Sequence, residues 1–447
     1  MRTATIAPAS VHETLARHML ADGYDMVLDL EKSRGRRLWD ARSRRYFLDV
    51  FSFFGTLPVG LNHPMLEDAG FRAKLTRAAL ANPANSDIYT TEFAEFVDTF
   101  ARLAMPAYLP YAFFVAGGTL GVENALKAAM DWKVRQNFRK GIKQEKGHRI
   151  IHFREAFHGR SGYTLSMTNT ADPRKYQYFA KFDWPRIINP ALRFPVDAAE
   201  LARVAQVERQ AIDQIKAAFA ERRDEVAAII IEPIQAEGGD NHFRGEFLAA
   251  LKQLALENDA LLIFDEVQSG VGLTGRFWAH EHFGVEPDLL AFGKKMQTCG
   301  VIGGGRIDVE PDNVFRVSSR INSTWGGNLV DMVRAQRYLE IIEEERLVEN
   351  AASLGARLLA RLQALSEEFP GLITNARGRG LMCAIDFPDA QLRDQAADKA
   401  YELGMVILPC GRRSLRFRPP LDITSAEIDE AADIVGQVAK TLAVKAA

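Results

Sequence analysis

The sequence predicts an α/β protein with a largely parallel sheet that is covered by helices on both faces. Short apolar runs alternate along the middle of the chain with longer stretches whose apolar residues recur at helical spacing. The runs lie at 112–116, 149–153, 226–231, 260–264 and 289–292. Strands of a parallel sheet read as continuous apolar runs because helices bury both of their faces, so this alternation indicates the fold class.

The length predicts more than one domain, because a single hydrophobic core stops growing beyond about 250–300 residues and the chain has 447. After residue 328 the pattern changes to a long helical stretch, 329–365, followed by short strand-like runs. This change predicts a smaller α+β domain. We place an N-terminal segment at 1–75, packing with the small domain, the large domain at 76–335 and the small domain at 336–447.

Two local patterns predict elements near the ends of the chain. Residues 37–52 have the composition of two paired strands. Thr424, with Glu427 three residues later, forms a capping-box pattern, in which each side chain satisfies a backbone N–H of the first helical turn. We therefore expect the last helix to begin there and to run through about Ala439.

The composition excludes several classes of function. Hydrophobic residues make up 47% and charged residues 26%, as in ordinary soluble proteins, and the formal net charge is -2. Without a polybasic block, neither nucleic acid nor an anionic membrane is an expected partner. The three cysteines lack CxxC spacing, which favours a reducing compartment and argues against a bound metal. With no secretory signal or apolar span, we expect a cytoplasmic protein.

Polar residues follow four of the predicted strands at the point where each strand ends. They are Gly117 to Thr119, Glu232 with Gln235, Asp265 with Gln268, and Lys294. Ligands of open α/β sheets bind beyond the carboxyl ends of the strands. The four strand ends are therefore expected to face one site.

A buried acid and a buried lysine on one sheet suit pyridoxal phosphate chemistry. Asp265 could keep the ring nitrogen protonated, while Lys294, given room by Gly293, could form a Schiff base and then carry a proton. A glycine turn that opens a helix is a natural phosphate cradle. Singly, each has an ordinary explanation: a helix cap, a solvated lysine such as we expect of Lys295, or a tight turn. Together they favour the cofactor site.

Six motifs resemble those of the class-III (ω-) aminotransferases of the fold-type I pyridoxal phosphate family, over nearly the whole chain. They are GGTLGVENALK, FHGR at 157–160, EPIQAEGGD at 232–240, IFDEVQSGVGLTG at 263–275, AFGKK at 291–295 and NSTWGGN at 322–328. The resemblance implies a large domain with a mostly parallel mixed sheet and a smaller α+β domain. It also implies a homodimer with active sites at the interface.

The same resemblance assigns the cofactor site. Lys294 and Asp265 would be catalytic, and the cofactor pyridoxal 5'-phosphate would also contact Gly118, Thr119, Phe157 and Gln268, with Thr324 reaching its phosphate from the other subunit. The chain departs from many relatives after Lys294, where it reads KMQTCG instead of a glycine-rich stretch. This departure removes no catalytic group but could reshape the pocket.

Arg160 and Arg416 are the candidate carboxylate-binding residues, since a guanidinium offers a carboxylate two parallel donors. By resemblance, Arg416 would hold the α-carboxylate of 2-oxoglutarate and Arg160 its distal carboxylate. An ω-amino substrate would place its carboxylate at Arg160, while Glu237 neutralises Arg416. Asn322, from the partner chain, is the candidate acceptor for a substrate α-amine. As isolated residues, the arginines could equally be surface groups and Glu237 an ordinary loop residue.

Within the family, the runs FHGRSGYTLS, KFDWPRI and NSTWGGNLVDMVRA resemble the members that act on L-lysine. The implied reaction transfers the ε-amino group of L-lysine to 2-oxoglutarate, giving 2-aminoadipate 6-semialdehyde and L-glutamate. The alternatives within the family are 4-aminobutyrate and ornithine aminotransferases. An aminomutase, racemase or decarboxylase would keep the same acid and lysine, and a non-catalytic binding protein is the third class.

Overall fold

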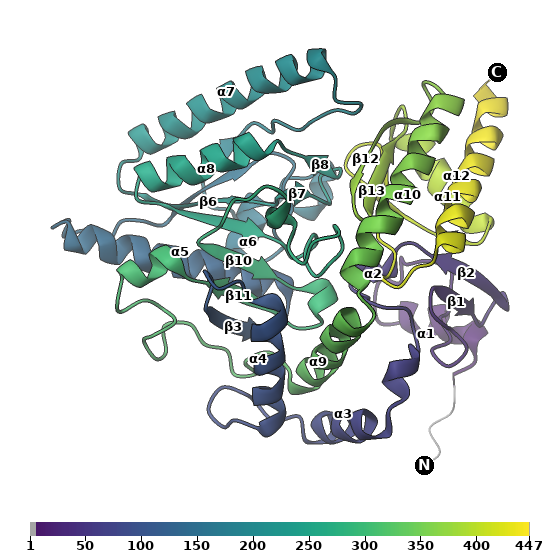
Figure 1. Ribbon diagram of the computed structural model, residues 1–447, viewed down its shortest axis with the longest axis horizontal. Coiled ribbons are helices and arrows are strands. Elements are labelled where there is room, and N and C mark those ends of the chain that lie inside the picture. Colours follow the sequence, from purple (N-terminus) through teal and green to yellow (C-terminus); the bar gives the residue numbers. More distant parts are fainter. Residues whose placement is uncertain (1–5, 447) are drawn as a thin grey trace.

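The computed structural model describes residues 6–446, and a seven-stranded sheet forms its centre (Figure 1). The strand order is β3-β11-β10-β9-β6-β4-β5; β11 is antiparallel to both of its neighbours, and every other neighbouring pair is parallel. The strands are β3 (Tyr111–Val115), β4 (Arg149–Phe153), β5 (Arg186–Ile187), β6 (Val226–Ile231), β9 (Leu261–Asp265), β10 (Leu289–Phe292) and β11 (Cys299–Gly303). The predicted mostly parallel mixed sheet is confirmed.

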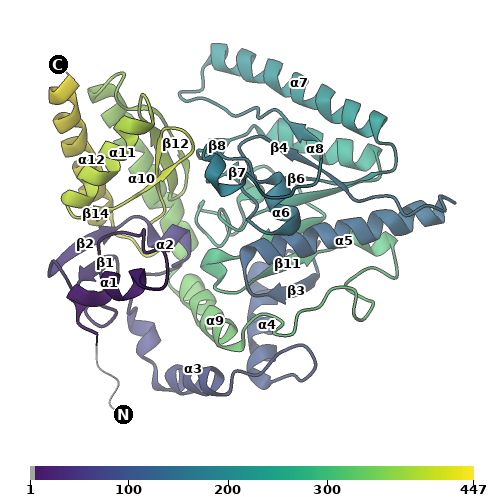
Figure 2. The same ribbon diagram turned by 180° about the vertical axis from the view of Figure 1, so that it is seen from behind.

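Helices cover both faces of this sheet (Figures 1 and 2). Helix α5 (Gly118–Arg139) packs on one face, and α7 (Ala198–Glu221) and α8 (Gly245–Glu257) pack on the other. Successive strand residues divide between the two cores: Ile150 packs with α5, whereas Ile151 packs with α7 and α8. Side chains alternate across a strand, so a strand covered on both sides must be apolar at every position.

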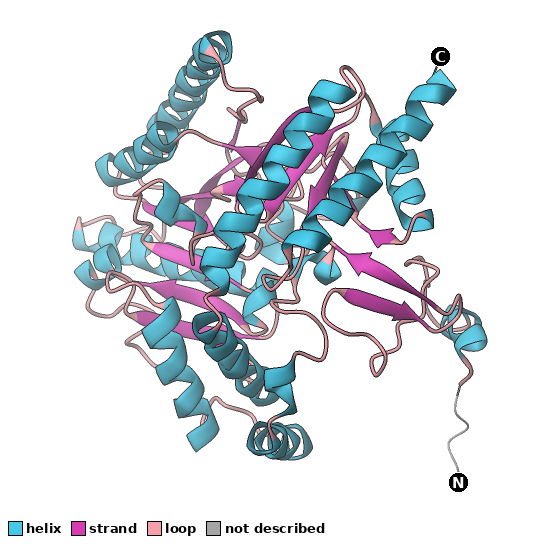
Figure 3. Ribbon diagram, turned by 45° about the vertical axis from the view of Figure 1, so that its right-hand side comes forward, coloured by secondary structure: helices cyan, strands magenta, loops and turns pink. Residues whose placement is uncertain are grey.

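The small domain contains a four-stranded antiparallel sheet with helices packed against it (Figure 3). Its order is β12 (Thr374–Arg379), β13 (Met382–Asp386), β16 (Ser414–Phe417) and β15 (Leu408–Cys410), and its helices are α10 (Leu347–Glu368), α11 (Ala390–Glu402) and α12 (Ser425–Ala446). The predicted capping box is confirmed, since Thr424 N–H donates to Glu427 Oε2 (2.9 Å) and Glu427 N–H to Thr424 Oγ1 (3.3 Å). The helix continues beyond the expected Ala439.

The predicted strand pair near the start of the chain is also confirmed. Strands β1 (Arg37–Asp40) and β2 (Arg45–Asp49) pair in antiparallel fashion, and β2 also pairs with β14 (Met405–Val406) in parallel. This second pairing supports the association of the N-terminal segment with the small domain, while the three domain boundaries stay a prediction.

The other elements join these domains or cover their edges. They are α1 (Val11–Ala16), α2 (Ser52–Gly55), α3 (Ala69–Ala81), α4 (Thr91–Ala104), α6 (Gly162–Met167), α9 (Leu329–Glu344), β7 (Ile234–Gln235), β8 (Asn241–His242) and short 3-10 turns. Within residues 6–446, no helix combines the length and the apolar character needed to cross a bilayer.

The predicted helical stretch over 329–365 consists of two helices. The structure divides it into α9 and α10, and Arg346 between them adopts a left-handed conformation with φ 52°. The sequence contains no glycine or proline at this break, so local pattern does not mark it. Leu347, the first residue of α10, is buried in the core that the two helices share.

Gly355 in α10 lies against the backbone of Gly380, and a Cβ added to it would lie 2.0 Å from the Gly380 carbonyl carbon. We expect Gly355→Ala to destabilise the fold by about 2–3 kcal/mol, because two backbones would have to separate. Urea unfolding followed by fluorescence measures this change. Gly436→Ala in α12 is the control, since its Cβ would meet only the flexible end of Leu365. Equal unfolding midpoints for the two variants would contradict the prediction.

Candidate active site

The carboxyl ends of the parallel strands open into a cavity of about 410 Å³. It is lined by Phe54, Gly118, Thr119, Phe157, His158, Gly159, Arg160, Lys175, Glu232, Ala236, Glu237, Asp265, Val267, Gln268, Lys294 and Arg416. The structure thus brings the predicted catalytic pair, the glycine turn and both arginines to one place.

Lys294 follows β10 and is held by two acceptors. Its Nζ donates to Gln268 Oε1 (2.6 Å) and to the carbonyl oxygen of Phe54 (3.2 Å). Burial, assisted by the nearby positive charge of Arg416, lowers the pKa of Lys294 to about 8. A Cβ on the preceding Gly293 would lie 2.9 Å from Cys299 Sγ, so the small residue expected there is required by packing.

Asp265 ends β9 and is oriented by a histidine that the sequence reasoning missed. His158 Nδ1 donates to Asp265 Oδ2 (2.7 Å), and Val267 N–H donates to Asp265 Oδ1 (3.1 Å). Burial opposes charge on His158, but its hydrogen bond to Asp265 raises the pKa of the imidazole above its ordinary value. These two donors fix the orientation of the Asp265 carboxylate and occupy both of its oxygens. His158 belongs to the quoted FHGR motif, which was the available signal.

Glu232 connects the loop that carries His158 to the turn that carries Glu237. Its carboxylate accepts the N–H groups of Phe157 (3.0 Å) and Ala236 (3.0 Å). Burial raises the pKa of Glu232 to about 7. The sequence placed this residue at a strand end but gave it no role, and the structure shows that it fixes two loops of the cavity.

The N-terminus of α5 lies where the phosphate cradle is predicted, and phosphate binding there stays a prediction. The helix begins at Gly118, directly after β3 and the turn residue Gly117, and a Cβ on Gly118 would lie 2.8 Å from Val267 Cγ1. Free N–H groups and the helix dipole favour a phosphate at such an end. With an oriented acid and a buried lysine of lowered pKa, the cavity has the groups that pyridoxal phosphate needs.

Arg416 in β16 brings the small domain to the cavity. Its side chain is only 3% exposed, and its Nη2 donates to Glu237 Oε2 (2.5 Å). Within the described chain, the buried Arg416 Nε and Nη1 have no hydrogen-bond partner, which suits an incoming carboxylate. The other oxygen, Glu237 Oε1, accepts from Lys175 Nζ, a contact that sequence reasoning missed. Arg160 is exposed, with its guanidinium 5.9 Å from the Phe157 ring centroid.

A buried ion pair fixes the two domains beside this contact. Arg418 Nη1 donates to Asp240 Oδ2 (2.9 Å), Arg418 Nη2 donates to Asp240 Oδ1, and both side chains are fully buried. The turn that carries Glu237 is thereby held against the strand that carries Arg416.

Two predicted site residues lie outside the cavity, and one expectation is wrong. Asn322 and Thr324 are exposed and are not among the cavity-lining residues, so their predicted roles, which involve a partner subunit, stay predictions. Lys295 is not solvated. It is 2% exposed, donates to the Leu57 carbonyl oxygen (3.2 Å), and has a pKa lowered by burial to about 7. The short turn after Gly293 directs the two lysines to different surroundings.

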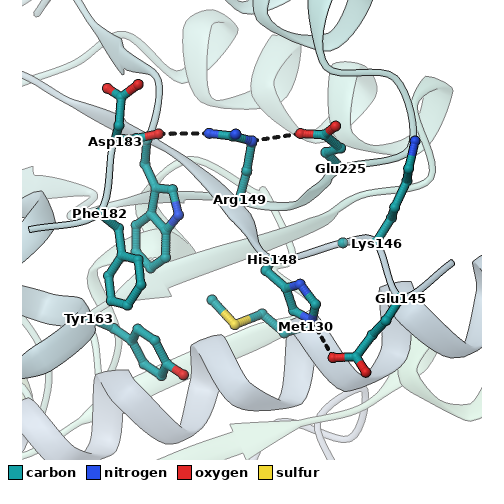
Figure 4. A pocket seen from close by; sticks show the side chains of 11 residues that line it. Met130, Glu145, Lys146, His148, Arg149, Tyr163, Phe182, Asp183 and Glu225 are labelled. Carbon is teal, nitrogen blue, oxygen red and sulfur yellow. Dashed lines mark hydrogen bonds and ion pairs between the residues drawn. The ribbon is translucent and has the colours of Figure 1, made fainter.

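A larger hollow of about 610 Å³ lies elsewhere (Figure 4). Its wall contains the Arg149–Glu225 ion pair (2.7 Å) and the stacked rings of Phe182 and Trp184. Arg149 begins β4, so this hollow lies at the amino ends of the parallel strands. Cofactors of such sheets bind at the carboxyl ends, and we therefore assign the chemistry to the smaller cavity.

Known proteins resemble this chain in sequence and in fold. The class-III aminotransferase family model matches residues 19–439. The chain belongs to the class-III aminotransferases. An L-lysine-epsilon aminotransferase of Mycobacterium tuberculosis is 52% identical over 425 residues, which cover 95% of this chain and 94% of that protein. The L-lysine-epsilon aminotransferase of Amycolatopsis lactamdurans is also 52% identical, over 94% of this chain and 93% of that protein.

A solved structure shows the same fold. The lysine aminotransferase of M. tuberculosis in its internal aldimine form is 51% identical, with a TM-score of 0.95, covering 97% of this chain and 99% of that chain. Human mitochondrial 4-aminobutyrate aminotransferase is more distant, at 31% identity over 90% of this chain and 82% of that protein. The predicted family, the fold-type I architecture and dependence on pyridoxal phosphate are confirmed.

The lowered pKa of Lys294, about 8, predicts how the apoenzyme takes up its cofactor. Only a neutral amine attacks an aldehyde, so the rate of reconstitution should rise with pH up to about 8 and then level off. Absorbance of the lysine-bound cofactor measures this rate, and Lys294→Ala should show no such band. A rate that keeps rising toward pH 10 would contradict the lowered pKa.

Proposed function

We propose that this aminotransferase moves the ε-amino group of L-lysine to 2-oxoglutarate, giving 2-aminoadipate 6-semialdehyde and L-glutamate. The observation that carries the proposal is the 52% identity, over nearly the full length of both chains, to enzymes named L-lysine-epsilon aminotransferase. The cavity supports it, because it offers two arginines at different depths beside one reactive lysine.

The cofactor residues have distinct tasks. Pyridoxal phosphate, when bound, supplies an aldehyde that exchanges amines and a ring that withdraws electrons from the reacting carbon. Asp265, oriented by its hydrogen bond with His158, would hold the ring nitrogen protonated. Gly118 and Thr119 would bind the phosphate at the start of α5, Phe157 would pack on the ring, and Gln268 would lie by its phenolic oxygen.

In the first half-reaction, Lys294 Nζ removes a proton from the ε-carbon of L-lysine. Its acceptors, Gln268 Oε1 and the Phe54 carbonyl, hold the amine in place while it carries this proton. Arg160 binds the carboxylate of L-lysine. Glu237 stays paired with Arg416 in this half-reaction. The buried guanidinium therefore keeps a charged partner while it lies beside the aliphatic part of the substrate.

In the second half-reaction, 2-oxoglutarate brings a carboxylate for each arginine. Arg416 binds the α-carboxylate through two parallel donors, Nη2 and one of the unpartnered Nε and Nη1, after Glu237 moves off Nη2. Arg160 binds the distal carboxylate. One cavity thereby accepts both a monocarboxylate and a dicarboxylate.

A homodimer completes this site. Residues 82–90 and 322–328 lie side by side, since Asn85 N–H donates to the Trp325 carbonyl oxygen (3.1 Å). Ile88, Tyr89 and Trp325 expose large apolar side chains there, which supports a protein interface. At that interface, Thr324 reaches the partner's phosphate site and Asn322 accepts the α-amine of L-lysine.

The free cysteines support a reducing, cytoplasmic location.

The substrate assignment is tested with an amine-donor panel of L-lysine, L-ornithine and 4-aminobutyrate, each with 2-oxoglutarate. We expect L-lysine to give the highest kcat/KM, with one glutamate formed for each cyclic imine trapped from the semialdehyde. Activity with 4-aminobutyrate but not with L-lysine would overturn the substrate assignment. Product formation without an added oxo acid would instead indicate an aminomutase, racemase or decarboxylase.

Glu237→Ala separates the two half-reactions. The variant leaves Arg416 buried and without its partner in the free enzyme and while L-lysine is bound, whereas 2-oxoglutarate supplies a carboxylate in its place. The rate constant of the L-lysine half-reaction should therefore fall about tenfold more than that with 2-oxoglutarate. Single-turnover absorbance measures each half-reaction separately. Equal losses in the two would remove the switching role of Glu237.

A further inference from the structure

One carboxylate in the cavity is shared by two cations from different parts of the fold. Glu237 Oε2 accepts from Arg416 Nη2, whereas Glu237 Oε1 accepts from Lys175 Nζ. The glutamate is on the turn after β7, the arginine is on β16, and the lysine ends the short turn Pro173–Lys175 before β5. Burial alone would raise the pKa of Glu237, but Arg416 and Lys175 hold it below its ordinary value.

The two cations differ in their surroundings. Arg416 is fixed within a strand and almost fully buried, whereas Lys175 is 20% exposed and lies on an irregular loop. When a substrate carboxylate takes over Arg416, Glu237 loses one of its two neutralising partners. A carboxylate that is 22% exposed and unpaired is costly to keep ionised, so the exchange requires a second cation that stays.

We propose that Lys175 is this second cation: a positioning residue that retains Glu237 when it leaves Arg416 and thereby sets the affinity for dicarboxylate substrates. The inference rests on the proposed function, in which Arg416 alternates between Glu237 and a substrate carboxylate. Lys175 thus acts through Glu237, without itself binding the substrate. A monocarboxylate held at Arg160 leaves Glu237 on Arg416 and does not depend on Lys175.

The rival role for Lys175 is direct binding of a substrate carboxylate, since it also lines the cavity. The two roles differ in their dependence on Glu237. A cation that acts by retaining Glu237 loses its effect once residue 237 carries no charge. A cation that binds the substrate keeps its effect whatever stands at residue 237.

The test uses two inert probes on the holoenzyme, glutarate with two carboxylates and pentanoate with one, and measures their dissociation constants by calorimetry. Lys175→Met should raise the dissociation constant of glutarate about tenfold, the effect of losing a hydrogen bond to a charged group. The dissociation constant of pentanoate should stay unchanged. Lys175→Arg should restore glutarate binding. Arg174→Met is the matched control, because Arg174 lies on the same turn and pairs with Asp172 instead.

The Glu237→Gln background decides between the two roles. There, Lys175→Met should leave the glutarate dissociation constant unchanged; an undiminished effect would show direct binding and overturn the inference. If Lys175→Met alone weakens the binding of glutarate and of pentanoate equally, the inference is also overturned, because that pattern indicates general damage to the cavity. If the unsubstituted enzyme neither binds glutarate nor accepts 2-oxoglutarate, the proposed function itself fails.

Discussion

The buried ion pair between Asp240 and Arg418 determines how the two domains meet at the active site. Two charges removed from water are tolerated only with close partners. Here Arg418 donates two hydrogen bonds, one to each carboxylate oxygen of Asp240. Asp240 lies three residues after Glu237, and Arg418 lies two residues after Arg416. The pair therefore places the substrate-binding arginine of one domain against the glutamate of the other, and Lys175 reaches the same carboxylate from a third segment.

The parts of the fold that local pattern determines were predictable. Strands β6 and β9 are buried on both faces, so their sequences are apolar at nearly every position. Strand β11 was missed because two of its five residues, Gly300 and Gly303, are glycines, which carry little strand signal. The break at Arg346 was missed for a different reason. A left-handed residue without glycine is imposed by the packing of the helices on either side, and that packing is a long-range property.

The same distinction separates the site residues that were found from those that were missed. Asp265 and Lys294 could be found because they directly follow predicted strands of one sheet. Lys175 could not, because it lies on an irregular loop and meets Glu237 only through the tertiary fold, 62 positions away. His158 was within a recognised motif, but a histidine next to a phenylalanine does not reveal that it contacts the carboxylate of Asp265.

The adjacent lysines 294 and 295 have a consequence for chemical selectivity. Burial lowers the pKa of Lys294 to about 8 and that of Lys295 to about 7, so both lysines offer a neutral amine near neutral pH more readily than a solvated lysine does. The availability of a neutral amine therefore does not by itself direct an aldehyde to Lys294. Access decides instead, because Lys295 Nζ is buried beneath the loop that contains Leu57, while Lys294 Nζ faces the cavity. The protein selects its reactive amine by shielding the competitor.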